Sequence, residues 1–215
     1  VLDGRLYAIG IPAILNLALP SLLVTFLNGL LAAFSQSYVV VLGIYYKLQT
    51  FLYLPANGIV QGMRPLIGYN YGAREHARVK KLFQLTLLMS AAIMAAGTVI
   101  CQFASGQLME LFTQNPETIA AGQTALRIIS IHFIIAAYGI VISSVFQALG
   151  DGMPSLIMSV SRQLVVLLPA AWLLSLTGEV NNIWWAFLIA EFVSAALCTI
   201  FFIRDYNRKL KHLGE

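Results

Sequence analysis

The chain has 215 residues, of which 59% are hydrophobic and only 10% are charged, and its formal net charge is +4 at pH 7. A soluble domain usually carries about 25% charged residues, so this composition excludes an ordinary soluble domain and indicates an integral membrane protein. The basic residues cluster between hydrophobic stretches, which argues against nucleic acid as a partner and makes the lipid bilayer the expected one.

Six apolar stretches are each long enough to cross a bilayer, which takes about 20 residues of helix. They lie near residues 6–33, 37–63, 82–104, 126–149, 153–176 and 183–203. The sequence therefore predicts an all-α membrane protein with six transmembrane helices. Between the third and fourth stretches, Asn115 precedes Pro116 and Glu117, which is a helix-start signal. We expect a short surface helix there, followed by a capped helix start.

The distribution of basic residues predicts the orientation. With six spans, both termini share one side with the loops after spans two and four. That side carries nine basic residues, whereas the three opposite loops carry none. The positive-inside rule then predicts that both termini lie in the cytoplasm. The expected location is the plasma (inner) membrane. The nine are Arg5, Arg74, Arg78, Lys80, Lys81, Arg204, Arg208, Lys209 and Lys211.

Residues 54–81 contain glycines and prolines at close intervals, and they end in basic residues. In a soluble protein this density would indicate a loop. Within hydrophobic sequence it predicts instead a membrane helix that is broken or tightly packed, because glycine permits close approach of a neighbouring helix and proline frees a backbone carbonyl.

This stretch also carries a resemblance to a known family. It reads PANGIVQGMRPLIGYNYGA followed by VKK, and it resembles the second helix of the C-terminal half of a multidrug and toxic compound extrusion (MATE) transporter. Three further motifs follow the same order: GIPAILN in the first span, FQALGDG after the fourth and SRQ in the fifth. The resemblance covers about residues 6–208. It implies that residues 1–215 form one six-helix lobe of a twelve-helix fold, and that the N-terminal lobe is absent from this sequence.

The resemblance implies a function as half of a secondary-active multidrug efflux antiporter. Such a protein exports amphipathic, often cationic, drug-like compounds in exchange for H+ or Na+ by alternating access between two lobes. One branch of the family carries carboxylates in the first and fourth helices of the C-terminal lobe, and both spans lack any acid here. Either the coupling ion binds in the missing N-terminal lobe, which we expect, or the chain is not coupled. We expect no other cofactor. The alternatives are a lipid-linked oligosaccharide flippase of the same superfamily and a membrane accessory subunit that does not transport.

Two ionisable residues in the last two spans are expected at similar depths. Arg162 should lie about 14 Å from the cytoplasmic face and Glu191 about 12 Å from the outer face, at about 1.5 Å per residue. In a hydrocarbon core about 30 Å thick, these levels differ by only a few ångströms. We therefore predict a structural ion pair, with proton carriage by Glu191 as the alternative.

Lys47 has no obvious acidic partner in the sequence and should lie about 15 Å deep in span two. On a helical wheel it shares a sector of about 100° with other polar residues of that span. Such a face must contact protein or water, so it either lines a substrate pathway or packs against another helix. The residues of this polar stripe are Lys47, Thr50, Asn57, Gln61 and Arg64.

A second set of substrate-pathway candidates lies in span one and consists of Ser21, Thr25 and Asn28. The alternative for these hydroxyls is a hydrogen bond back to their own helix. Arg64 and Arg127 lie near span ends, and we interpret them as interfacial anchors that reach toward the headgroups.

The remaining reactive residue types have structural interpretations. His132 is expected to pack between helices rather than to bind a metal, because no second ligand follows at helical spacing. Both cysteines, at positions 101 and 198, lie in apolar segments and are expected to be buried thiols. HExxH, GxSxG, Walker A and GxGxxG motifs are missing from the sequence, so we predict neither an enzyme nor a metal site.

Overall fold

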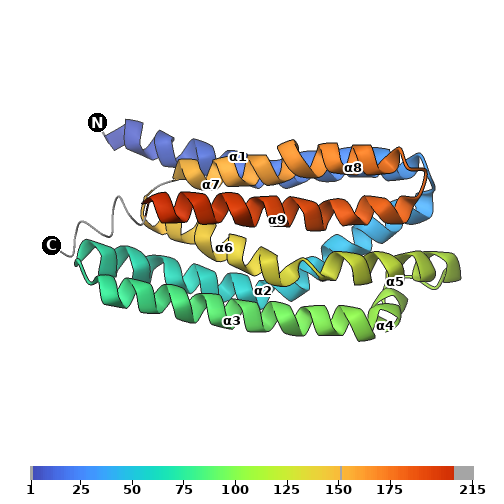
Figure 1. The fold of residues 1–215 in the computed structure, drawn as a ribbon, viewed down its shortest axis with the longest axis horizontal. Coiled ribbons are helices and arrows are strands. Elements are labelled where there is room, and N and C mark those ends of the chain that lie inside the picture. Colours follow the sequence, from blue (N-terminus) through green and yellow to red (C-terminus); the bar gives the residue numbers. More distant parts are fainter. Residues whose placement is uncertain (1, 151, 206–215) are drawn as a thin grey trace.

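The computed structural model describes the backbone of residues 2–150 and 152–205. Before residue 18 the description includes only a few of the side chains. Val1, Asp151 and residues 206–215 lie outside this description. The cytoplasmic location of the two termini therefore stays a prediction. The described residues are helical and contain no strand, which confirms the all-α class (Figure 1). The elements are α1 (Leu2–Ala32), α2 (Gln36–Gly72), α3 (His76–Phe103), α4 (Ser105–Glu110), α5 (Pro116–Ser130), α6 (Phe133–Ala148), α7 (Gly152–Val160), the π-helical turn η1 (Ser161–Leu167), α8 (Leu168–Ser175) and α9 (Val180–Asp205).

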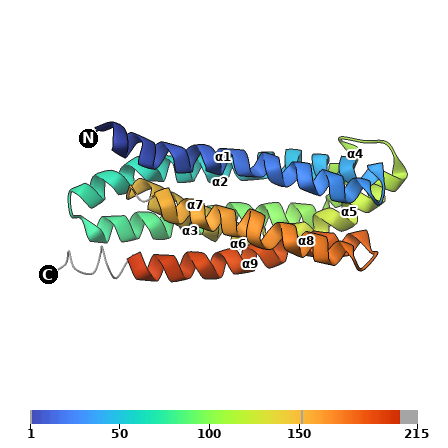
Figure 2. The same cartoon turned by 90° about the horizontal axis from the view of Figure 1, so that it is seen from above.

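The helices run lengthwise in an elongated bundle (Figures 1 and 2). α1 packs against α7 and α8, α2 against α3, α3 against α6, and α9 against η1 and α8. The start of α1, the α2–α3 turn and the end of α9 lie at one end of the bundle. The α1–α2 turn, α4 and the α8–α9 turn lie at the opposite end. This arrangement agrees with the prediction that successive spans run in opposite directions, which places successive turns at opposite ends of the bundle.

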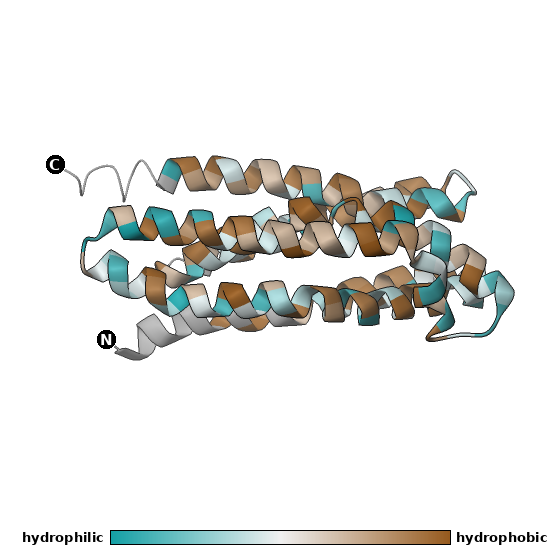
Figure 3. Cartoon of the chain, turned by 90° about the horizontal axis from the view of Figure 1, so that it is seen from below, coloured by the Kyte–Doolittle hydropathy of each residue, from teal (hydrophilic) through white to brown (hydrophobic). Residues whose placement is uncertain are grey.

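The hydropathy of the bundle fits a bilayer. Among the described residues, four helical segments are long and apolar enough to cross a membrane, and α5 with α6 makes a fifth if the bent pair is one span. α1 contributes a shorter apolar stretch, Ala18–Ala32. Figure 3 shows brown, hydrophobic ribbon along the length of the bundle and teal, hydrophilic ribbon gathered at its ends.

The helix of the predicted second span, residues 37–63, is longer than predicted. Of the two alternatives for its glycine- and proline-rich part, a broken or a tightly packed helix, the break does not occur. α2 is one helix of 37 residues that continues through Pro55 and Pro65. The expected close packing is found at Gly68, where an added side-chain carbon would lie 3.4 Å from the Ala148 carbonyl oxygen of α6. At Gly62 nothing lies within 4 Å. The helix extends beyond the apolar run because its amphipathic last turns still bury Ile67 and Asn70.

The predicted fourth span, residues 126–149, is not one straight helix. The helix begins at Pro116, where the Asn115 side chain accepts a hydrogen bond from the Glu117 backbone N–H at 3.0 Å, as the cap signal predicted. The expected short helix before it is α4. α5 and α6 then meet at a bend of 52°.

Side chains of α3 account for this bend. The Thr98 hydroxyl donates to the Ser130 carbonyl at 3.0 Å, and the Gln102 amide donates to the Arg127 carbonyl at 2.7 Å. Side chains that bond to helix carbonyls replace the regular backbone ladder and are a known cause of kinks.

The predicted fifth span, residues 153–176, contains a π-helical turn at η1. Pro169 lies two residues after the end of this turn and has no backbone N–H to donate. The Leu168 N–H instead bonds the Gln163 carbonyl, five residues earlier. π-helical turns occur often at functional sites, and this one carries Arg162.

Candidate functional site

Arg162 of η1 and Glu191 of α9 form an ion pair inside the bundle. Arg162 Nη1 donates to Glu191 Oε1 at 2.7 Å. The Glu191 side chain is 8% exposed and that of Arg162 32% exposed. The structure thus brings together the two side chains that the sequence paired by their similar depths in two spans joined by a short loop. Arg162 also lines two partly open cavities, and Glu191 borders one of them.

The first cavity, of about 130 Å³, lies between α1, α2, η1 and α9. Three buried polar atoms of its lining residues have no hydrogen-bond partner among the described residues: Tyr46 Oη, His132 Nδ1 and Gln163 Oε1. Glu191 borders the same space. Sequence reasoning missed this grouping, although Pro169 beside the SRQ motif was a signal that the helix there is irregular.

His132 lies at the junction of α5 and α6. Its ring stacks on Phe187 at a centroid distance of 6.2 Å and meets Phe133 edge-on at 5.2 Å. The residue is buried. These contacts are those of a helix-packing residue.

The second cavity, of about 140 Å³, lies between α2, α6, the α7–η1 segment and α9, and its polar lining is made of arginine and serine. Arg64 Nη2 donates to the Ser144 hydroxyl at 3.0 Å, and Arg64 Nε is buried without a partner among the described residues. The polar side chains around the cavity are Arg64, Ser143, Ser144, Ser159, Arg162 and Ser194.

The interpretation of Arg64 as a snorkelling anchor is therefore wrong. α2 continues for two more turns beyond this residue, so Arg64 is not at a helix end, and its guanidinium is directed to α6. Arg127, the other predicted anchor, is exposed on α5, and its Nε donates to the Ser105 hydroxyl at 3.3 Å.

The polar stripe of α2 lies on the outside of the described bundle. Lys47, Thr50, Asn57 and Gln61 are all exposed. The Thr50 hydroxyl bonds the Tyr46 carbonyl of its own helix at 2.9 Å. Among the described residues, ion pairs join only Arg78 to Glu75 and Arg162 to Glu191, so Lys47 has no acid there. The described helices do not cover this face.

The substrate-pathway candidates of α1 are Ser21, Thr25 and Asn28, and the alternative for the two hydroxyls was a hydrogen bond within the same helix. The Thr25 hydroxyl donates to the Ser21 carbonyl at 2.9 Å, which is the local bond considered as the alternative. Both residues are exposed, and Asn28 is half-buried. Thr25 also borders an open groove of about 440 Å³ beside Trp172 of α8. The structure does not bring these residues to either of the two cavities beside Arg162.

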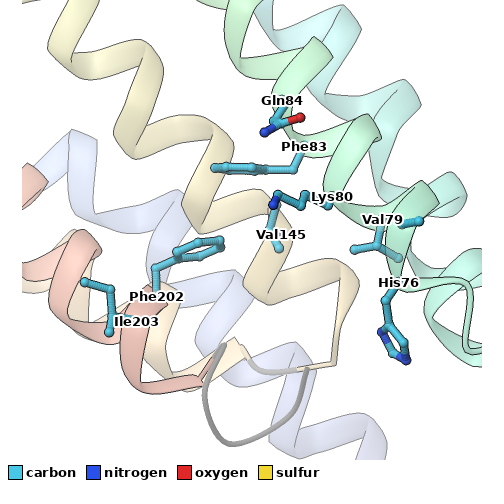
Figure 4. Close-up of a pocket in the computed structure, with 9 residues that line it drawn as sticks. His76, Val79, Lys80, Phe83, Gln84, Val145, Phe202 and Ile203 are labelled. Carbon is cyan, nitrogen blue, oxygen red and sulfur yellow. The ribbon is translucent and has the colours of Figure 1, made fainter. Parts of the chain in front are cut away.

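A separate, mostly apolar pocket of about 410 Å³ lies between α3, α6 and α9 at the end of the bundle that holds the α2–α3 turn (Figure 4). Phe83 and Phe202 stack in it with centroids 5.1 Å apart. Lys80 extends into the same space, beside Val145. None of the predicted pathway residues lines this pocket.

The two cysteines are buried and free, as predicted. The Cys198 thiol borders the serine-lined cavity and lies 3.0 Å from the Met158 sulfur.

Comparison with known proteins identifies the family. The family model described as MatE matches residues 12–173. The chain belongs to the MatE family. The chain is 26% identical over 204 residues to the multidrug export protein MepA of Staphylococcus haemolyticus and 27% identical over 205 residues to MepA of Staphylococcus aureus. These alignments cover 95% and 94% of this chain but 45% of each relative.

Solved MATE structures share the fold. The multidrug transporter DinF-BH superposes with a TM-score of 0.84 at 29% identity, covering 96% of this chain and 46% of that one. A mutant of the Vibrio cholerae transporter VcmN superposes with a TM-score of 0.88 at 21% identity, covering 94% and 46%. This MatE chain thus spans about half the length of the relatives that it matches. Together with its apolar helices, these likenesses show a multi-pass membrane protein with the fold of one half of a MATE transporter.

Proposed function

We propose that this MatE chain acts as half of a secondary-active multidrug efflux antiporter. Working with a second lobe, it would export amphipathic, often cationic compounds in exchange for H+ or Na+ by alternating access. Both the MepA proteins and DinF-BH are named as multidrug transporters. Transport, rather than catalysis, is the role that we assign to it.

The exposed polar stripe of α2 is the observation that carries this proposal. Lys47, Asn57 and Gln61 are exposed on an apolar helix long enough to cross a membrane. A charged group at that depth is costly against lipid and is found facing protein or a water-filled cavity. We therefore propose that this face lines the substrate pathway between two lobes.

Three further features of the proposal follow from the charges. The coupling ion would bind in the second lobe, because the first and fourth predicted spans carry no acid and Glu191 is already paired with Arg162. The protein would lie in the plasma (inner) membrane. The end of the bundle that holds the α2–α3 turn would face the cytoplasm, because this turn and the start of α3 carry four basic residues.

Reconstitution of the complete protein into liposomes tests the proposal. A fluorescent amphipathic cation should move against its gradient when either a proton or a sodium gradient is imposed, and an ionophore that collapses the driving gradient should stop it. Movement that is indifferent to both gradients would refute antiport, and no movement with either would refute efflux of cations. Liposomes without protein provide the control for passive partition.

A further inference from the structure

The charges around the serine-lined cavity do not balance. Arg162 is neutralised by Glu191 at 2.7 Å. Arg64 has no carboxylate partner among the described residues, and its one hydrogen bond goes to the neutral Ser144 hydroxyl. The lining contains no aspartate or glutamate. One net positive charge therefore remains beside a partly open cavity of a membrane protein, where a charge is costly unless water or a counter-charge reaches it.

The lining also offers hydrogen-bond donors in excess. Arg64 Nε is buried and has no partner among the described residues. The Ser144 hydroxyl is 2% exposed, and because it accepts from Arg64, its own proton remains to be donated. The Ser159 and Ser194 hydroxyls border the same space; the Ser194 hydroxyl is hydrogen-bonded to the Cys198 sulfur, and a hydroxyl proton can rotate from there toward an anion. Donors that converge on a cavity beside a guanidinium are the chemistry that binds an anion.

We propose that this cavity, between α2, α6, the α7–η1 segment and α9, binds a small monovalent inorganic anion such as chloride. Arg64 supplies the balancing charge, and the Ser144, Ser159 and Ser194 hydroxyls supply donors. The volume of about 140 Å³ exceeds the roughly 10–15 Å³ that one water needs, so an anion fits together with a few waters. A metal cation is disfavoured, because both arginines would repel it.

This site is independent of the transported substrate and of the coupling ion. It accounts for the orientation of Arg64 toward α6, which an interfacial anchor does not require. The bound anion joins helices that are distant in the sequence, since Ser144 and Ser194 belong to α6 and α9. Binding should therefore stabilise the folded lobe.

Thermal unfolding of the complete protein in detergent tests the site. The parent is unfolded in sodium chloride, sodium bromide and sodium gluconate at equal sodium concentration. A ligand that binds only the folded state raises the folded-to-unfolded ratio by the factor 1 + [L]/Kd, which is about 11-fold at ten times Kd. Chloride and bromide should therefore raise the midpoint progressively, whereas gluconate, which is much larger, should not.

Two arginine variants separate the site from general salt effects. Arg64→Gln should abolish the chloride response. Arg127→Gln is the matched control, because Arg127 also donates to a serine, Ser105, but is exposed and does not line the cavity. Its response should equal that of the parent.

Three outcomes would overturn the proposal. An equal rise in chloride and gluconate would show screening only. An equal chloride response in Arg64→Gln and the parent would place any anion elsewhere. A parent that ignores chloride but is destabilised by Arg64→Gln would show that a carboxylate of another part of the protein pairs with Arg64. If Arg64→Gln cannot be purified, the double variant Ser144→Ala/Ser194→Ala decides, because an unchanged chloride response there would also exclude the site.

Discussion

Removing either member of the Arg162–Glu191 pair should destabilise the protein, and by unequal amounts. Glu191 is 8% exposed, so Arg162→Ala leaves a carboxylate with little access to water. We expect that variant to lose about 3–5 kcal/mol, the usual cost of breaking a buried pair. Arg162 is 32% exposed and lines two cavities that can hold water, so Glu191→Ala leaves a guanidinium that is less enclosed than the carboxylate. The expected loss there is about 2 kcal/mol, near the value of a hydrogen bond to a charged group.

The double variant Arg162→Ala/Glu191→Ala should recover much of this loss. It leaves neither charge unpaired, and removing both members of a buried pair is often close to neutral. If the double variant is close to neutral, the interaction energy, which is the loss of the double variant minus the two single losses, should be about 5–7 kcal/mol in magnitude, above the range of about 0.5–3 kcal/mol that is usual for contacting residues. Unfolding of the complete protein in mixed detergent micelles, followed by circular dichroism, measures each corner of the cycle.

The surface pair Glu75–Arg78 provides the matched control. Its charged atoms lie 3.8 Å apart, and the side chains are 49% and 70% exposed. A cycle on this pair should give about 0–1 kcal/mol. If the losses at Arg162 and Glu191 are simply additive, or if their interaction energy is no larger than that of the control pair, the buried pair does not form and the assignment of depths fails.

Three further predictions follow from the turns and from α2. Cysteines placed at Arg78 and at Glu179 of a cysteine-free protein should react differently with an impermeant maleimide in right-side-out cells, and labelling at position 78 would contradict the proposed orientation. Gly178 has a φ of 78°, so Gly178→Ala should cost about 1–2 kcal/mol in unfolding measurements, whereas Gly178→Asn should cost less; equal costs would argue against a left-handed turn. Lys47→Ala should impair gradient-driven efflux of a fluorescent cation while membrane insertion stays normal, and an unchanged rate, or a cysteine at position 47 that small thiol reagents cannot reach, would remove Lys47 from the pathway.

Hydropathy predicted that the long helices exist but not where they end. It detects only the apolar middle of a helix, whereas α2 continues past the predicted end at residue 63 to Gly72. In those last turns the Asn70 amide bonds the Leu66 carbonyl of the same helix at 2.8 Å, so polar residues stay within the helix. The pairing of Arg162 with Glu191 was accessible because it depends on depth, which counting residues gives, and on the short loop that makes the last two spans neighbours.

The bend between α5 and α6 and the two cavities depend on contacts that a single helix does not encode. The bend needs Thr98, which lies on α3 and reaches the Ser130 carbonyl 32 residues away in sequence. The hydrogen bond from Arg64 to Ser144 spans 80 residues. To predict either contact, one must know how each helix is rotated about its own axis relative to its neighbour. The helical period of the apolar residues in the sequence shows only which face of a helix is directed toward the core.

The spacing of the unpaired charges on α2 implies two counter-charges rather than one. Lys47 and Arg64 both lack a carboxylate among the described residues, and Arg64 follows Lys47 by 17 positions in one helix. At about 1.5 Å per residue the two are separated by about 26 Å along the helix axis, so no single carboxylate or bound anion can contact both, because an ion pair needs its charged atoms within about 4 Å. An anion bound beside Arg64 would therefore not neutralise the charge of Lys47. A carboxylate opposite Lys47 would likewise not neutralise the charge of Arg64. The chloride response should accordingly survive Lys47→Ala unchanged, and a loss of that response would show that both charges share one partner.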